Sequence, residues 1–398
     1  MDRIDFEHRT RLVYGVGAVE QLGGLSRQLG ARRALVVSDS GVVAAGHFQR
    51  AMDSLMTAGI LAESFLDVHE NPTTVDVQAG LDTAQQAQPD LLIGIGGGSS
   101  MDCTKGINFL YSCGGRMEDY WGVDKATGPM LPMIAVPTTS GTGSEAQSFA
   151  LISQANSGKK MACGDRRAAC KIAVLDPELT LTQPARVTAL TGIDAISHAL
   201  ETYVSKRRNP LSACYSREAW QLLVHGFPRV LEQPDDLEAR GEMQLGAYFA
   251  GLAIETSMLG AAHALANPLT TRFGITHGQA VGMMLPSVIR FNGSQVDQWY
   301  SDLWYDAART QLGQQCAADC SSADSTSQVE WLAQLVQRLV ELAGLETELL
   351  NLGVSEESLD ALATEATHQW TGSFNPRALS QADYRELYQQ TMVRRVAS

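Results

Sequence analysis

The feature that most constrains the fold is a change in hydrophobic pattern near Pro184. Before this residue, apolar runs of strand length alternate with segments whose apolar residues recur at helical spacing. The strand-like runs are ALVVSD (34–39), ESFLDV (63–68), LLIGIG (91–96), PMIAVP (132–137) and KIAVLD (171–176), and the helices expected between them cover 48–59, 75–88 and 100–112. This alternation predicts a mostly parallel sheet that is covered by helices on both faces.

After Pro184 the strand-like runs stop and long amphipathic segments follow. The helices expected there cover 184–205, 212–231, 236–258, 278–291, 328–345 and 380–393, and the polar segment CAADCSSADSTSQ (316–328) is expected to be a loop. The chain has 398 residues, which suits two or three domains of about 150 residues each. We therefore predict an α/β domain over residues 1–183 and an all-helical domain over residues 184–398.

Composition narrows the range of partners. The formal net charge is −14, and a surface this acidic repels nucleic acid and anionic lipid. The N-terminus carries charges where a signal peptide needs an apolar stretch, and no run of about 18 apolar residues occurs. Seven cysteines, an odd number scattered along the chain, do not suggest a disulfide framework. We expect a cytoplasmic protein that binds neither nucleic acid nor membranes.

Two glycine-rich turns follow expected strands. GIGGGSSMD (94–102) opens an expected helix, where exposed backbone and a helix N-terminus suit a phosphate group. Ser99 stands where the usual dinucleotide fingerprint has its third glycine, so this motif alone is also compatible with a simple tight turn. PTTSGTGSE (137–145) adds hydroxyl groups after the next strand. Two such turns at neighbouring strand ends favour a ligand site at the carboxyl edge of the sheet.

Asp39 ends the first strand-like run. A carboxylate at this position could accept hydrogen bonds from a ribose diol and would repel a 2′-phosphate. The alternative is a solvated aspartate at a strand end with no role in binding.

The segment GIDAISHALETYV (192–204) places a carboxylate and an imidazole in apolar surroundings. Asp194 and His198 are four residues apart, so they share one face of a helix. His263 and His277 lie downstream in similarly small, apolar settings. Burying an unpaired carboxylate is costly, and a divalent cation removes that cost.

One carboxylate and three imidazoles suit Fe²⁺ or Zn²⁺. Each histidine taken alone is better explained by a role in packing or capping, so the Asp-x-x-x-His spacing carries most of the argument. Cys316 and Cys320 have the same spacing but fall in the expected polar loop, and we interpret that pair as incidental.

Taken together, several of these motifs resemble the iron-containing (group III) alcohol dehydrogenase family, with its dehydroquinate-synthase-like fold. The resemblance covers nearly the whole chain and rests on GGGSSMDCTK (96–105), PTTSGTGSE (137–145), LDPELT (175–180), GIDAISHALETYVS (192–205), HALANPL (263–269), HGQAVGMMLPSVIRFN (277–292) and NPRALSQADYRELY (375–388). It implies an N-terminal Rossmann-like domain, a helical C-terminal domain and an active site in the cleft between them.

The resemblance also implies roles for individual residues. The metal ligands, through which catalysis would occur, would be Asp194, His198, His263 and His277. The dinucleotide would contact Asp39, Asn71, Gly96, Gly97, Gly98, Ser99, Asp102, Thr138, Thr139, Thr142, Lys160 and Leu179. The flanking residues Phe149, Leu151, Ile254 and Asn267 are candidates for the substrate pocket, and Asn267 stands where many family members carry a second histidine.

The function that the resemblance implies is that of a metal-dependent, NAD(P)-linked alcohol dehydrogenase or aldehyde reductase acting on a small alcohol or aldehyde. The metal would act as a Lewis acid on the substrate oxygen, and the nicotinamide would carry the hydride. Asp39 favours NAD(H) over NADP(H). A homodimer is the expected assembly.

Three other functions remain open on the sequence alone. A zinc-dependent polyol dehydrogenase of the glycerol type would be distinguished by metal content and a polyol panel. Enzymes of the maleylacetate-reductase type generally work without the full metal set, which is present here. A nucleotide-binding sensor would need no Lewis acid, and it would bind NADH without turning over alcohols or aldehydes.

Overall fold

The computed structural model describes residues 7–320 and 327–392 and divides the chain into two compact units. The N-terminal unit contains the chain up to Thr139 together with Gly143–Gln183. The C-terminal unit contains Ser140–Thr142 and the chain from Pro184 onward. The main division therefore falls between Gln183 and Pro184, where the hydrophobic pattern of the sequence changes.

A six-stranded parallel sheet forms the centre of the N-terminal unit, as predicted. Its spatial order is β1-β9-β6-β4-β2-β3. The strands are β1 (Arg11–Tyr14), β2 (Arg33–Val37), β3 (Leu61–Phe65), β4 (Leu91–Gly96), β6 (Met133–Pro137) and β9 (Ile172–Leu175). The edge strand β1 was not among the expected strands, because its RLVY sequence is only partly buried and short.

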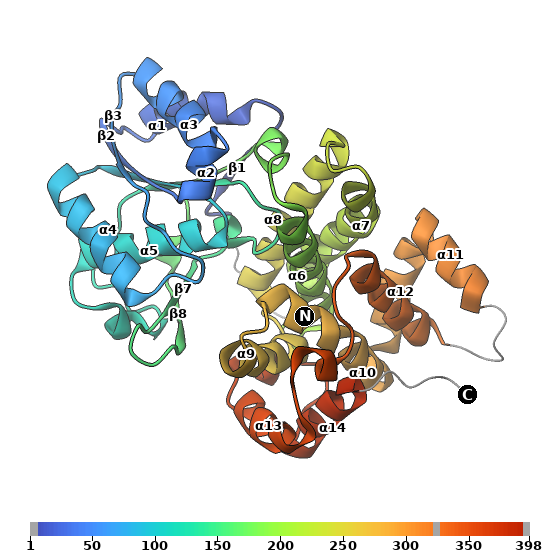
Figure 1. Cartoon of the computed structure of the whole chain (residues 1–398). Helices are drawn as coiled ribbons and strands as arrows, with labels where there is room; N and C mark the ends of the chain where they lie inside the picture. Colours follow the sequence, from blue (N-terminus) through green and yellow to red (C-terminus); the bar gives the residue numbers. More distant parts are fainter. Residues whose placement is uncertain (1–6, 321–326, 393–398) are drawn as a thin grey trace. The chain divides into compact units, whose positions relative to one another are not determined.

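Helices cover both faces of this sheet (Figure 1). Along β2, Leu35 and Val37 face one core while Ala34 and Val36 face the other, which is the period of two expected for a strand. The first core includes residues of α4 and α5 and the second includes residues of α1 and α3. The helices of this unit are α1 (Leu22–Gln28), α2 (Ser40–Ala44), α3 (His47–Thr57), α4 (Thr74–Ala87) and α5 (Gly98–Cys113).

A second, three-stranded sheet was not anticipated. It has the order β5-β8-β7 and consists of β5 (Gly122–Val123), β7 (Phe149–Ser153) and β8 (Lys160–Gly164). Strands β7 and β8 run antiparallel and present alternating buried and exposed residues. The FALIS run of β7 is as long and as apolar as β2 and was overlooked, whereas β8 (KMACG) is bounded by a lysine and a glycine and is defined by its pairing with β7.

The C-terminal unit is helical, as predicted, and contains none of the strands found among the described residues. Its helices are α6 (Ala185–Val204), α7 (Pro210–Glu232), α8 (Leu237–Ser257), α9 (Ala261–Phe273), α10 (His277–Ala307), α11 (Gln311–Cys320), α12 (Gln328–Leu342), α13 (Leu359–Thr367) and α14 (Gln381–Met392). Short 3-10 helices in the two units are η1 (Ala18–Gln21), η2 (Met117–Tyr120), η3 (Ser144–Ala146), η4 (Arg166–Ala168), η5 (Pro177–Thr180), η6 (Leu349–Leu352), η7 (Glu356–Ser358) and η8 (Trp370–Phe374).

Helix α6 is the central helix of this unit. From Thr188 to Val204 every residue except Thr191 is buried, because α7, α8 and α10 pack around it. A helix that is buried on all sides cannot expose its polar side chains to water, so any polar side chain on α6 needs a partner in the core.

Three expectations for the helical unit need correction. The segment 316–328 was expected to be a loop, but residues 316–320 belong to α11 and Cys316 is buried. Residues 321–326 lie outside the described part of the chain. Helix α10 continues to Ala307 through a break at Val296 (φ −134°, ψ 28°), well beyond the expected end at residue 291. Helices α9, α11 and α13 were not among those expected.

Among the described residues, no single helix is long and apolar enough to cross a membrane. The pair α8 and α9 satisfies the same criterion only together, with a bend of 104° between the two helices.

Candidate functional site

Helix α6 presents Asp194 and His198 on one face. The Nε2 atom of His198 lies 3.4 Å from Asp194 Oδ1, and both side chains are less than a tenth exposed. Both residues were predicted to converge, and the four-residue spacing on a continuous helix is sufficient to explain it.

Two other helices bring further imidazoles to the same oxygen. His263 on α9 places its Nε2 atom 3.6 Å from Asp194 Oδ1, and His277, the first residue of α10, places its Nε2 atom 3.7 Å away. The close approach of α10 depends on Gly278, because a Cβ atom there would clash with the backbone carbonyl of Leu190 on α6. The rings of His198 and His263 stack with centroids 4.9 Å apart.

The distances fit a metal ion better than direct hydrogen bonds. Separations of 3.4–3.7 Å exceed the usual N–H···O range of about 2.7–3.2 Å. Asp194 Oδ1 and His263 Nε2 are buried and have no hydrogen-bond partner among the described residues. Tetrahedral ligands at about 2.1 Å from a metal lie about 3.4 Å from one another. The donor set can therefore hold a divalent cation.

Asp194, His263 and His277 each offer a ligand atom within 4.8 Å of the other two. His198 is outside that triangle, but its distance to the carboxylate is the shortest of the three imidazole distances. Three of the four side chains are buried, and His277 is the exception with 30% of its side chain exposed. Among the four side chains, His277 is therefore the most accessible to solvent.

Burial and charged neighbours shift the pKa values of the cluster residues in different directions. Burial alone would raise the pKa of Asp194, but the three imidazoles hold that pKa well below its usual range. Burial lowers the pKa of His198. Burial also acts to lower the pKa of His263, but the carboxylates of Asp194 and Glu201 outweigh it and raise the pKa of His263 to about 9.

Glu201 is a buried residue that the sequence reasoning missed. Its Oε2 atom lies 2.6 Å from His263 Nδ1, on the side of the ring opposite to the metal cluster. It also accepts hydrogen bonds from the backbone N–H groups of Gly260 and Ala262. A signal was present in the sequence, because Glu201 lies seven residues after Asp194 and three after His198, on the same face of α6.

In the N-terminal unit, the predicted nucleotide residues gather at the carboxyl edge of the large sheet. Strands β2, β4 and β6 are neighbours, and they are followed by Asp39, the Gly96–Ser99 turn and Thr138–Thr139. The Thr138 N–H group donates to the Gly96 carbonyl at 2.9 Å. The two glycine-hydroxyl turns and Asp39 therefore lie at one edge, as the sequence predicts for a ligand site in a parallel sheet.

The first turn requires its glycine. Gly96 has φ +145°, and a Cβ atom there would clash with the Ser100 side chain. Helix α5 then begins at Gly98 with no side chain capping its N-terminus. Exposed amide groups and the positive end of the helix dipole make this end of α5 suitable for a phosphate group.

Asp39 has a structural role in addition to any role in binding. Its Oδ1 atom caps α2 by accepting from the N–H groups of Gly41 and Val42, and its Oδ2 atom accepts from the Ser100 hydroxyl at 3.2 Å. The carboxylate is partly exposed at the sheet edge and retains capacity to accept from a ribose.

Asn71 and Lys160 lie together near the Gly96–Ser99 turn. Asn71 adopts a left-handed conformation with φ +54°, and its N–H group donates to the Ser99 hydroxyl at 3.2 Å. Lys160 on β8 donates to the Asn71 side-chain oxygen at 3.4 Å. The structure thus places Asn71 and Lys160 close to Ser99, another residue predicted to contact the dinucleotide.

Other predicted nucleotide residues are less accessible. Leu179 is fully buried in the core behind the sheet, so it offers no exposed surface to a ligand. Asp102 accepts from the Ser144 hydroxyl at 2.7 Å, and burial raises its pKa. Thr142 belongs with Ser140 to the C-terminal unit, whereas Thr138 and Thr139 belong to the N-terminal unit.

Lys105 is a second buried residue that the motif contained but the sequence reasoning did not single out. It is fully buried, and its ammonium group donates to the Ser144 carbonyl, the Ser144 hydroxyl and the Phe149 carbonyl at 2.6, 2.9 and 2.8 Å. Lys105 therefore ties the start of β7 and the second glycine-hydroxyl turn to α5.

The four predicted substrate-pocket residues divide between the two units. Phe149 and Leu151 lie on the same face of β7 in the N-terminal unit, and the buried Ala150 between them points to the opposite face. Ile254 is buried in α8. Asn267 lies on α9, one turn after His263, and its Nδ2 atom donates to Gln369 Oε1 at 2.9 Å.

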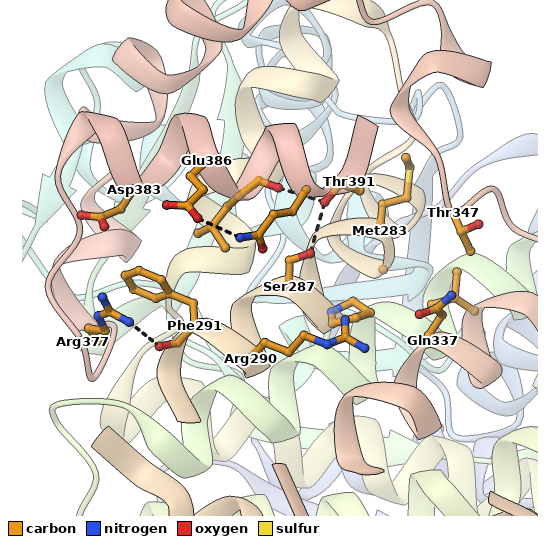
Figure 2. A pocket seen from close by; sticks show the side chains of 15 residues that line it. Met283, Ser287, Arg290, Phe291, Gln337, Thr347, Arg377, Asp383, Glu386 and Thr391 are labelled. Carbon is orange, nitrogen blue, oxygen red and sulfur yellow. Dashed lines mark hydrogen bonds between the residues drawn. The ribbon is translucent and has the colours of Figure 1, made fainter. Parts of the chain in front are cut away.

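A separate pocket of about 600 Å³ opens among α10, α12 and α14 (Figure 2). None of the four candidate ligands lines it. Its cationic residues are already paired, since Arg290 bridges to Glu330 at 2.7 Å and Arg377 stacks on Phe291 and donates to the Phe291 carbonyl. We do not include this pocket in the candidate site.

A parallel α/β unit with phosphate-compatible strand ends, joined to a helical unit with a carboxylate-imidazole cluster, is the arrangement expected of an enzyme that uses a nucleotide and a metal. Comparison with known families gives the same class. Residues 9–177 match the family model described as iron-containing alcohol dehydrogenase, and residues 188–392 match the C-terminal model of the Fe-containing alcohol dehydrogenase family.

Individual relatives cover almost the full chain. The NAD-dependent methanol dehydrogenase of Bacillus methanolicus is 30% identical over 96% of this chain and 97% of its own. The crystal structure of a 1,3-propanediol oxidoreductase superposes with a TM-score of 0.92 at 28% identity, covering 98% of this chain and 100% of that chain. Sulfoacetaldehyde reductase from Bifidobacterium kashiwanohense, solved in complex with NAD⁺, gives a TM-score of 0.86 at 25% identity over 98% of each chain.

The chain therefore belongs to the iron-containing alcohol dehydrogenase family. It is an NAD(P)-dependent alcohol dehydrogenase, and the recognition made from the sequence motifs is confirmed.

Proposed function

We propose that Asp194, His198, His263 and His277 hold one divalent iron ion per chain and that the enzyme interconverts a small alcohol and its carbonyl compound with NAD(H). The observation that carries this proposal is the arrangement around Asp194 Oδ1. Three imidazole Nε2 atoms lie 3.4–3.7 Å from this buried oxygen, which has no hydrogen-bond partner among the described residues.

Iron bound there would act as a Lewis acid on the substrate oxygen, while the nicotinamide would carry the hydride. The protein residues supply the binding site for the ion. Asp194 contributes the single negative charge, and the imidazoles contribute neutral nitrogen donors in a setting that excludes most water. The partial exposure of His277 supports entry of the substrate on that side.

We propose that the carboxyl edge of the N-terminal sheet binds the dinucleotide. The pyrophosphate would lie on the Gly96–Ser99 turn at the N-terminus of α5, and Thr138, Thr139 and Thr142 would lie on the adenosine side. Asn71, Asp102 and Lys160 would lie near the dinucleotide. Leu179 is not expected to touch it directly, because it is fully buried. Asp39 would accept hydrogen bonds from the ribose and disfavour a 2′-phosphate.

The relatives do not define one substrate. The three described above are named for methanol, 1,3-propanediol and sulfoacetaldehyde, which are small molecules with a terminal hydroxyl or aldehyde, whereas another relative is named for long-chain alcohols. We infer that this enzyme also acts on a small primary alcohol or aldehyde. The proposed pocket residues are Phe149, Leu151, Ile254 and Asn267.

We further propose that the enzyme forms a homodimer and that it is located in the cytoplasm. Six described cysteines are free thiols, which supports a reducing compartment. The dimer follows only from the general preference of oligomers for two-fold symmetry. Sedimentation of the purified protein and fractionation of the source cells test these two proposals.

The decisive experiment is a substrate panel on metal-loaded protein under anaerobic conditions. Metal-free protein is loaded separately with Fe²⁺ and with Zn²⁺, and NADH oxidation is measured with aldehydes, ketones and polyol-derived carbonyl compounds. Turnover of small aldehydes by the Fe²⁺ form supports the proposal. Activity restricted to polyols with Zn²⁺ would identify a zinc-dependent polyol dehydrogenase instead, and NADH binding without any turnover would identify a nucleotide sensor.

A further inference from the structure

We propose that Glu201 is a positioning residue for the metal, because it holds His263 in the protonation form that leaves Nε2 available as a ligand. This inference rests on the proposed metal site. It concerns a residue that lies on the far side of the His263 ring and contributes no ligand atom itself.

Glu201 is 3% exposed and accepts three hydrogen bonds with its two oxygens. Its Oε2 atom accepts from the Gly260 N–H group at 3.1 Å and contacts His263 Nδ1 at 2.6 Å. Its Oε1 atom accepts from the Ala262 N–H group at 2.6 Å. All of these groups are buried, so water does not compete for them.

The identity of the partners determines where the His263 proton lies. Backbone N–H groups only donate, and an ionised carboxylate only accepts. The short contact to His263 Nδ1 therefore requires a proton on that nitrogen. When the ring carries one proton, Nε2 has an unshared electron pair, and this atom lies 3.6 Å from Asp194 Oδ1. The nitrogen that a metal needs is thus selected by the hydrogen bond on the other side of the ring.

The substitution Glu201→Gln would not reproduce this arrangement, although glutamine has nearly the same shape as glutamate. The introduced amide would have to direct its NH₂ group either at the Ala262 N–H group or at His263 Nδ1. In the first orientation, the amide NH₂ group and the Ala262 N–H group are two donors that face each other. The second orientation opposes the Gly260 N–H group, which donates to the same Glu201 oxygen, and it favours the His263 tautomer with its proton on Nε2, which cannot bind a metal through that atom.

The position of Glu201 on α6 links the ligands of two helices. Asp194, His198 and Glu201 lie on one face of α6, and Glu201 reaches the N-terminus of α9, which carries His263. Gly260 permits the contact, because a Cβ atom there would lie 2.9 Å from Glu201 Oε1. One carboxylate therefore sets the position of α9 and the protonation of its ligand together.

A purely structural role is the main alternative, since Glu201 also caps α9. The chain offers a matched control for that role. Asn375 Oδ1 accepts from the Ala261 N–H group at the same helix end, and Asn375 is 1% exposed, but its side chain hydrogen-bonds to Asn292 and Arg377 rather than to His263. Asn375→Ala removes a buried cap from α9 and leaves the His263 hydrogen bond in place.

The first test measures metal affinity with Co²⁺ as the probe, on metal-free full-length protein titrated against a competing chelator. Loss of such an outer hydrogen bond typically weakens metal binding about 10- to 100-fold. We expect Glu201→Gln to weaken Co²⁺ binding by that amount and to change the visible d–d absorption. Asn375→Ala should stay within a few-fold of the wild type. Equal Co²⁺ affinity for Glu201→Gln and the wild type would overturn the inference, as would an equal loss in both variants.

The second test observes His263 directly, and its deciding spectrum is that of the wild type; folded variants are needed only for the assignment and for the comparison with Glu201→Gln. Wild-type protein with ¹⁵N-labelled histidine is loaded with Zn²⁺, and the resonance missing in His263→Asn identifies His263. We expect a far-downfield, slowly exchanging proton on Nδ1 that moves upfield or is lost in Glu201→Gln. A wild-type spectrum without that proton would refute the positioning role while leaving the metal site intact. Failure of the wild type to bind either ion would overturn the metal site and this inference together.

Discussion

The nucleotide edge of the N-terminal unit and the metal cluster of the C-terminal unit are built in opposite ways. At the sheet edge, Asp39 and Asn71 are partly or fully exposed and already make hydrogen bonds to neighbouring groups. In the cluster, Asp194 and His263 are buried and leave atoms without hydrogen-bond partners among the described residues. The first site offers backbone and hydroxyl groups, and the second offers side chains from three helices.

This difference indicates how each site depends on its ligand. Polar groups that are satisfied by the protein or by water cost little when no ligand is present. A buried carboxylate oxygen without a hydrogen bond is costly unless a positive charge compensates it. The metal cluster should therefore be intolerant of substitution, whereas the nucleotide edge should tolerate changes that alter specificity.

The strongest test of this comparison is removal of a metal ligand. His198→Ala and His277→Ala should each lose bound metal and lower kcat/KM by about 10³-fold or more, since Lewis-acid stabilisation amounts to several kcal/mol. Metal content and NADH-dependent turnover are measured on the same preparations. His225→Ala is the matched control, because His225 is a histidine of α7 that pairs with Glu242 outside the cluster. Full activity in a metal-free preparation would contradict the assignment.

The corresponding test of the nucleotide edge is neutralisation of Asp39. The wild type should have a higher kcat/KM with NADH than with NADPH, and Asp39→Asn should reduce that ratio about 10-fold or more because a like-charge contact with the 2′-phosphate is removed. Asparagine can still cap α2, whereas Asp39→Gly would relax the preference and also lose the cap.

Asp53→Asn serves as a control for net charge, because Asp53 is an acidic residue of α3 that bonds to Gln49. A wild type that prefers NADPH would show that Asp39 does not discriminate between the cofactors.

A smaller effect is expected at Asn267, a position at which the family resemblance implies a histidine in many members. Asparagine cannot take up a proton, so Asn267→Ala should change kcat only modestly. Asn267→His should introduce or shift an ionisation in the kcat profile between about pH 6 and 8, since free histidine has a pKa of about 6.5. The pH profile is recorded with metal and cofactor saturating, and a primary deuterium isotope effect checks whether hydride transfer masks the proton step. An unchanged profile under these conditions would argue against a relay role for the position.

The smallest effect on turnover is expected at Glu145, another buried carboxyl group, where the predicted change is in stability; no imidazole cluster among the described residues surrounds it. Burial raises its pKa from 4.5 to about 7 despite the opposing effect of Lys105. The folded state therefore favours the protonated form, so this contribution to stability is present below about pH 4.5 and is lost as the pH rises through 7. Each pKa unit corresponds to about 1.4 kcal/mol.

Glu145→Gln should accordingly make Tm depend less on pH between 5 and 8. Each kcal/mol of pH-dependent stability that the substitution removes should reduce the change in Tm over this range by about 2–4 °C. Calorimetry of the wild type, Glu145→Gln and the exposed-site control Glu63→Gln measures this. Identical slopes in the wild type and Glu145→Gln would show that Glu145 is already ionised at pH 5.

Elements with strong local patterns were predicted correctly. The apolar runs that became β2, β4, β6 and β9 are fully or almost fully buried, so their hydrophobicity is visible residue by residue. The three-stranded sheet was missed because the apolar run of β7 was overlooked and β8 is defined by its pairing with β7. The loop expected over 316–328 was partly wrong because small polar residues in α11 are compatible with a helix that packs on one side through Cys316.

By itself, the sequence determined the features that depend on neighbours along the chain. These are the alternation of strands and helices before Pro184, the glycine turns at strand ends, and the convergence of Asp194 with His198 across one helical turn. The family motifs added His263 and His277 without explaining how they reach the same oxygen.

Only the tertiary structure decided which distant groups meet. The absence of a side chain at Gly278 lets α10 approach α6, and the absence of one at Gly260 lets Glu201 reach α9. The same long-range packing buries Leu179, and it brings the Lys105 ammonium group to the Ser144 carbonyl of the second glycine-hydroxyl turn. Spacing along the chain encodes contacts within a helix or turn, whereas contacts between helices depend on the shapes of surfaces that come together only when the chain folds.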